Sequence, residues 1–114
     1  MFWKGCSPMP KHSHEADALF EGILKLRTVE ECYRFFEDIC TIKEFMALAQ
    51  RFQVACQLDA GRNYNEVYED TGVSSATICR VNKCLQYGNG GYRLILDRLK
   101  QEGVQNVGAD SQEG

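Results

Sequence analysis

The chain has 114 residues, of which 44% are hydrophobic and 25% charged, which is enough for one compact domain and hardly for two. Its 16 acidic residues outnumber its 13 basic residues, and the net charge of -3 has the wrong sign for a protein that coats nucleic acid unselectively. No apolar run approaches the roughly 18 residues of a membrane span, and the first residues lack the apolar stretch of a signal peptide. We therefore expect a soluble, cytoplasmic protein without a membrane partner.

The six cysteines and two histidines do not have the spacing of a metal site. No Cys-x-x-Cys pair occurs, and His12 and His14 both lie in the polar N-terminal part of the chain. We expect neither a metal nor another cofactor. Catalysis is not expected either, because no Ser, Cys or carboxylate pair has a recognisable base at a suitable spacing.

Apolar residues recur at helical spacing along most of the chain, and both prolines lie before residue 11. The sequence therefore predicts an all-α fold with about six helices. The expected helices cover about residues 14–24, 28–40, 41–60, 63–72, 75–86 and 92–100. Residues 1–13 are predicted to be a flexible arm and residues 101–114 a disordered acidic tail, which leaves residues 14–100 as the helical domain.

Three of these helices are predicted to begin at a capping box, in which the first residue and an acidic residue three positions later bond each other's backbone. The predicted boxes are Thr28 with Glu31, Thr41 with Glu44, and Asn63 with Glu66. On the first two helices the apolar positions make one stripe each, and we expect the stripe of the second helix to be its buried face.

Residues 63–86 have the arrangement of a helix-turn-helix, the DNA-reading motif in which a short helix and a sharp turn precede a second helix. Gly72 can adopt the positive φ that the turn requires. Val67, Val73 and Ile78 are expected to hold one helix against the other. The start of the second helix carries small residues that let a backbone approach base edges, and Arg80 and Lys83 follow on the same helix, where they can bind phosphates or guanine.

Charge is unevenly distributed along the chain. Residues 1–59 carry 7 basic and 9 acidic residues, whereas residues 74–100 carry 5 basic residues and 1 acidic residue. The acidity therefore lies away from the predicted second helix of the motif, as binding to phosphates requires. The alternative is that a helix-glycine-helix corner is only a packing device in an all-α domain.

Residues 48–51, 65–67 and 71–82 resemble the tryptophan repressor family, and more closely its YerC/YecD group. The stretch Gly-x-x-x-Ala-Thr-Ile-x-Arg, which begins at Gly72, is the most specific part, and the resemblance covers about residues 14–100. It implies an intertwined homodimer in which helices of both chains build one core. It also implies two helix-turn-helix units that read a palindromic operator in double-stranded DNA.

The resemblance also implies where an amino-acid-like effector would bind. Thr41, Arg51, Thr77 and Arg80 fall where the family lines its tryptophan pocket. Two nearby positions depart from the family: Val81 replaces a glycine that makes room for the indole, and Cys84 replaces a serine that accepts a hydrogen bond from the ligand's ammonium group. We therefore expect an effector other than tryptophan at these six positions, or none.

The expected function is that of a DNA-binding transcriptional regulator of the repressor type. Tyr68 is unusual, because most helix-turn-helix motifs carry a small residue at its position. The alternative is a helical protein-interaction module that keeps the fold but has lost DNA binding. The candidate DNA-contacting residues are Asn65, Tyr68, Ser74, Ser75, Ala76, Thr77, Cys79, Arg80 and Lys83.

Overall fold

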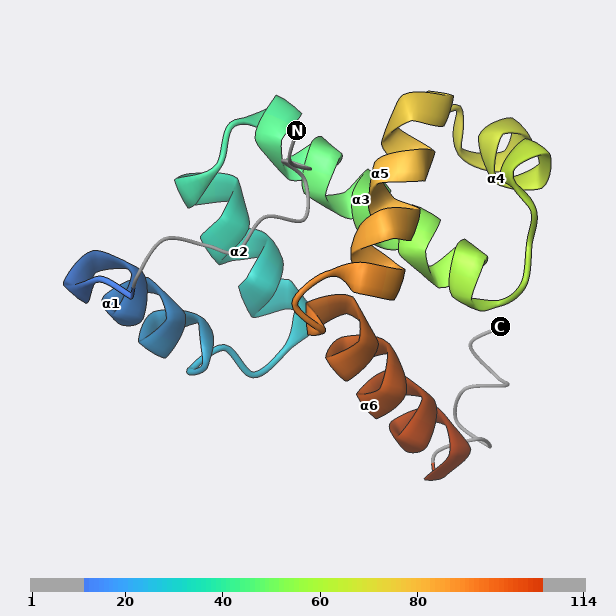
Figure 1. Cartoon of the computed structure of the whole chain (residues 1–114). Coiled ribbons are helices and arrows are strands. Elements are labelled where there is room, and N and C mark those ends of the chain that lie inside the picture. Colours follow the sequence, from blue (N-terminus) through green and yellow to red (C-terminus); the bar gives the residue numbers. More distant parts are fainter. Residues whose placement is uncertain (1–11, 106–114) are drawn as a thin grey trace. The chain divides into compact units, whose positions relative to one another are not determined.

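The computed structural model describes residues 12–105, which form six helices and no strand (Figure 1). The all-α prediction is therefore confirmed. The helices are α1 (His14–Ile23), α2 (Val29–Ile39), α3 (Ile42–Asp59), α4 (Tyr64–Thr71), α5 (Ser75–Tyr87) and α6 (Gly91–Gln105). Among the described residues, no helix is both long and apolar enough to cross a membrane.

The end of the last helix differs from the sequence prediction. α6 continues to Gln105, five residues beyond the expected end at Lys100, so the first part of the predicted tail is helical. The remainder of that tail and most of the predicted N-terminal arm lie outside the described residues.

The helix starts follow the predicted caps closely. At α3, Glu44 N–H donates to Thr41 Oγ1 over 3.1 Å, and Thr41 N–H donates back to the Glu44 carboxylate over 2.8 Å. Asn63 and Glu66 form the same reciprocal pair at α4. α2 differs in one bond, because the Glu31 carboxylate accepts from the N–H of Arg27 rather than from that of Thr28.

The described chain divides into two compact units, residues 12–50 and residues 51–105, with α3 running from one into the other. Residues 51–105 contain a hydrophobic core to which α3, α4, the following turn, α5 and α6 all contribute. Its buried members are Val54, Ala55, Val67, Val73, Ile78, Val81 and Leu96. The core anchors the two helices of the predicted DNA-reading motif.

Residues 12–50 contain no buried residue at all. The expectation that the apolar stripe of α2 is buried is wrong for the single chain, in which Val29, Tyr33 and Ile39 are 73%, 52% and 50% exposed. The rings of Tyr33 and Phe45 do approach each other, with centroids 6.1 Å apart. The apolar side chains of α2 therefore remain largely exposed in the single chain.

Candidate nucleic-acid interface

The corner between α4 and α5 has the geometry that the sequence predicts. Gly72 caps α4 with a φ of +73°, in the left-handed region that a glycine adopts at low cost. Val67 and Ile78 are fully buried and Val73 is 7% exposed. These three side chains therefore hold the two helices together, as predicted.

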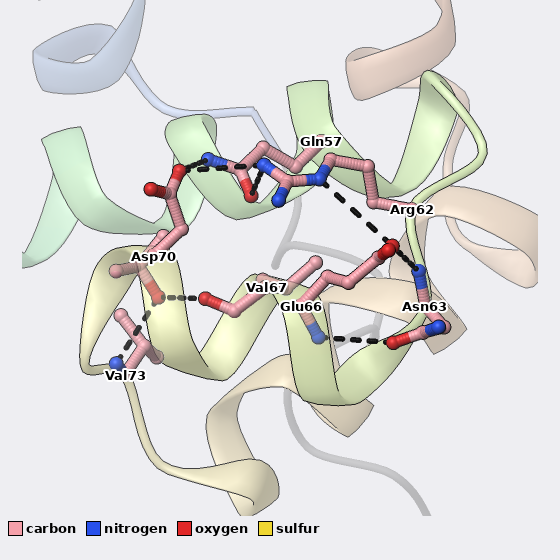
Figure 2. Close-up of polar contacts among 8 residues, drawn as sticks. Gln57, Arg62, Asn63, Glu66, Val67, Asp70 and Val73 are labelled. Carbon is pink, nitrogen blue, oxygen red and sulfur yellow. Dashed lines mark hydrogen bonds and ion pairs between the residues drawn. The ribbon is translucent and has the colours of Figure 1, made fainter.

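Thr71 is a positioning residue that the sequence reasoning missed. Its hydroxyl donates to the carbonyl of Val67 over 2.8 Å and accepts from the N–H of Val73 over 3.1 Å (Figure 2). The hydroxyl thus bridges the last turn of α4 and the first residue after Gly72. A Thr directly before the turn glycine is the local signal that indicates such a bond.

A polar network joins α4 to the end of α3. Gln57 donates to Asp70 over 2.7 Å, and Arg62 donates to both Gln57 and Asp70 over 3.2 and 3.4 Å (Figure 2). Arg62 also lies 4.0 Å from Glu66. These contacts fix the first helix of the motif from the side of α3, and they place Arg62 in a structural role.

The start of α5 is capped by Ser74, whose hydroxyl accepts from the N–H of Thr77 over 3.3 Å and donates to the Thr77 hydroxyl over 3.2 Å. Two candidate DNA-contacting residues are therefore bonded to each other. They shape the helix terminus that would face a groove.

The two sides of α5 differ in burial. Ile78 and Val81 point into the core, with exposed fractions of 0% and 2%. The candidate DNA-contacting residues of α5 share the other side: Ser75, Ala76, Arg80 and Lys83 are exposed, and Thr77 and Cys79 are half-buried. On α4, Asn65 and Tyr68 are exposed as well. The structure thus gathers the candidates on the surface of one helix-turn-helix.

The positive charge near the motif is smaller than the residue count indicates. Arg93 and Lys100, both on α6, each lie 2.8 Å from the Asp59 carboxylate, and Arg93 is also paired with Asp97 over 3.3 Å. The hydrogen bonds from Arg93 and Lys100 lower the pKa of Asp59. Arg93 and Lys100, which belong to the basic residues counted between positions 74 and 100, are therefore engaged with acidic groups.

The candidate effector residues occupy different settings. Thr41 is the N-cap of α3 in the unit of residues 12–50, and the other five lie in the unit of residues 51–105. Arg51 is exposed, and its charge opposes the rise in the pKa of Tyr92 that burial causes. Val81 belongs to the core, and Cys84 is half-buried on α5.

No three His, Cys, Asp or Glu side chains within residues 12–105 are grouped so that they could hold a metal ion.

The model of the Trp repressor protein family matches residues 14–100. The uncharacterized protein YerC of Bacillus subtilis is 53% identical over 87 residues, which are 76% of this chain and 84% of YerC.

Two crystal structures share the fold. A TrpR-like protein from Eubacterium eligens is 48% identical, with a TM-score of 0.74 over 77% of this chain and 91% of its own. A proposed Trp repressor from Staphylococcus aureus is 45% identical, with a TM-score of 0.75 over 78% of this chain and 89% of its own. Proteins of this family are regulators rather than enzymes. This chain belongs to the Trp repressor family.

Proposed function

We propose that this protein is a transcriptional regulator that binds a palindromic operator in double-stranded DNA as a homodimer. The observation that carries the proposal is the α4–α5 corner, which places small and basic residues on the exposed side of a core-anchored helix. Membership of the Trp repressor family supports it.

In the proposed complex, α5 lies in the major groove with its first turn toward the base edges. Ser75 and Ala76 are small enough to allow close approach, and Arg80 can donate two parallel hydrogen bonds to a guanine. Lys83, one turn further along, and the exposed Asn65 and Tyr68 of α4 are suited to phosphate contacts, which set the register.

The exposed apolar residues of the unit 12–50 support a homodimer. Leu24, Val29 and Ile42 are 80%, 73% and 75% exposed in the single chain. Exposed apolar side chains in such number are typical of an interface. A second copy would cover them, and it would supply the second helix-turn-helix that a two-fold symmetric operator requires.

The proposal is tested by selecting bound duplexes from a random pool with the purified full chain. We expect enrichment of a palindrome that binds the protein with an affinity falling steeply with salt. Arg80→Ala should weaken binding by roughly 5- to 150-fold, corresponding to about 1–3 kcal/mol. Arg27→Ala removes the same charge outside the motif and serves as the control.

The result against the proposal is the absence of any enriched sequence. If the protein then also co-purifies with a specific protein partner, the interaction-module alternative is supported. Equal losses of affinity in Arg80→Ala and Arg27→Ala would show that the attraction is one of general charge, without base recognition.

A further inference from the structure

α4 is negatively charged, although in the proposed complex it approaches DNA. Residues 63–86, the helix-turn-helix, carry three acidic and two basic residues. The basic residues, Arg80 and Lys83, are both on α5, whereas all three acidic residues are on α4. Contacts to the phosphate backbone favour positive charge, so the acidity of α4 needs an explanation.

Two of these acidic residues, Glu66 and Asp70, have structural partners within the chain. Asp70 accepts from Gln57 over 2.7 Å and lies 3.4 Å from the Arg62 guanidinium, which is also 4.0 Å from Glu66 (Figure 2). Glu66 in addition completes the capping box at the start of α4. Both carboxylates therefore serve the start of α4 and its attachment to α3.

The third acidic residue, Glu69, is on another side of the same helix. It lies four residues after Asn65 and directly after Tyr68, and all three side chains are exposed. Residues four positions apart are neighbours on a helix surface, so Glu69 shares the candidate DNA-contacting side of α4. Within residues 12–105 its carboxylate has no hydrogen-bonding or ionic partner.

The position of Glu69 is also unfavourable for the helix itself. It belongs to the last turn of α4, next to the partially negative C-terminus of the helix. Asp70 lies in the same turn but is offset by Arg62, whereas Glu69 forms no ion pair with another described residue. The stability of the fold therefore does not account for a carboxylate at this position.

Glu69 lies near the part of the motif that is proposed to face the base edges. Three residues join the last turn of α4 to the first turn of α5, and the buried Val67 and Ile78 hold the two helices together. In the proposed complex the first turn of α5 lies in the major groove. The last turn of α4, with Glu69 on its exposed side, is then at the edge of the same groove.

A carboxylate at the edge of the major groove is selective, because it accepts hydrogen bonds and donates none. The phosphate oxygens are acceptors too, as are the N7 and O6 atoms of purines and the O4 atom of thymine, so all of them repel it. The amino group at N4 of cytosine is a donor with no acceptor beside it on the same base, whereas the amino group of adenine lies beside N7. Cytosine is therefore the base that a carboxylate tolerates best.

We propose that Glu69 is a specificity-determining residue that accepts a hydrogen bond from the N4 amino group of a cytosine in each half of the operator. The inference rests on the proposed function and adds to it a base that the protein selects. Because the carboxylate is repelled by the other groups of the groove, it also weakens binding to other sequences.

The test compares the full wild-type chain with Glu69→Gln and Glu69→Ala in selections from a random duplex pool. We expect the wild-type operator to contain a cytosine–guanine pair at one position of each half-site. Glu69→Gln should select adenine there, because an amide side chain forms two hydrogen bonds with adenine, and Glu69→Ala should have no preference. Asp38→Asn removes an exposed carboxylate outside the motif and should select the wild-type sequence.

Binding titrations with the selected duplex give the size of the effect. Exchanging the cytosine–guanine pair should weaken wild-type binding at least about fivefold and Glu69→Ala binding less than about twofold. The melting temperatures of Glu69→Gln and Glu69→Ala should be equal to or higher than that of the wild type, because the carboxylate is unfavourable at the helix end.

Three results would overturn the inference. If both Glu69 variants select the same operator as the wild type, Glu69 reads no base, although the regulator proposal stands. If Glu69→Ala binds every duplex more tightly by the same factor, the carboxylate only repels phosphates, and the inference is wrong while the proposed function again stands. Absence of any selected sequence for the wild type contradicts both the inference and the proposed function.

Discussion

The environment of Asp59 departs from what its position in the sequence indicates. It is the last residue of α3, where a negative charge is unfavourable because the helix C-terminus is itself partially negative. Its side chain is nevertheless only 11% exposed and is paired with Arg93 and Lys100. These two positively charged side chains of α6 offset the negative charge at the C-terminus of α3. Their ion pairs with Asp59 also link α6 to α3.

Replacing Asp59 by Asn should therefore destabilise the protein in a pH-dependent way. The pKa of Asp59 in the folded state lies below its ordinary value of 3.8, so its stabilising contribution is complete above that value. It is lost as the pH falls through the lowered folded-state pKa. At neutral pH we expect a loss of about 1–2 kcal/mol, because both partners are partly exposed and screened by water.

Urea unfolding of wild type and Asp59→Asn between neutral and strongly acidic pH measures this difference, which should shrink as the carboxylate is protonated. Asp97→Asn is the control, since Asp97 is an exposed partner of Arg93 and its loss should cost less than about 0.5 kcal/mol. A destabilisation of Asp59→Asn that is the same at every pH would mean that packing, and not charge, connects α3 and α6.

Among the elements, the turn between α4 and α5 depends on one backbone conformation. A Cβ atom at Gly72 would meet no other atom within 4 Å, so the cost of a substitution there comes from its φ of +73° alone. Gly72→Ala should destabilise the protein by about 1–2 kcal/mol.

Gly22 provides the matched control. It lies within α1, a Cβ there also meets nothing within 4 Å, and its φ is outside the left-handed region. Gly22→Ala should therefore stabilise the protein by about 0.5–1 kcal/mol. Thermal unfolding of the two variants should shift in opposite directions, and shifts of the same sign would refute the conformational explanation.

The same elements show how far the sequence predicts the structure. Caps and turns were predictable because their bonds join residues three or four positions apart, as in the box of Asn63 and Glu66. The bond between Asp59 and Arg93 spans 34 positions and depends on how helices pack, which no local pattern encodes. The candidate surface of α5 followed from helical spacing, whereas the engagement of Arg93 and Lys100 with Asp59 could not be read from a count of charges.

For the whole molecule, the contrast between the two units is the main feature to be explained. Residues 51–105 have a core, and residues 12–50 have none, although α1 and α2 are rich in apolar residues. If the chain functioned as a monomer, these side chains would stay in water, and a polar replacement would change stability by no more than about 0.5 kcal/mol.

Val29→Lys distinguishes the two cases. Val29 is 73% exposed in the single chain, so lysine is tolerated there in a monomer. In the proposed homodimer the ammonium group of the lysine would be removed from water without a partner. We therefore expect the dissociation constant of the dimer to rise at least about tenfold. Light scattering across a concentration series measures the change, and operator affinity should fall with it because one chain supplies only one helix-turn-helix.

Asp38→Lys is the control, because it introduces a lysine at an exposed position on the opposite side of α2. It should leave the molar mass measured by light scattering unchanged. A dimer that survives Val29→Lys with unaltered stability would show that this side of α2 is not the interface. The wild type could also be monomeric in solution and still bind a palindrome. Two chains would then have to assemble on the DNA itself. In that case the salt dependence and the cooperativity of binding would reveal two separate binding events.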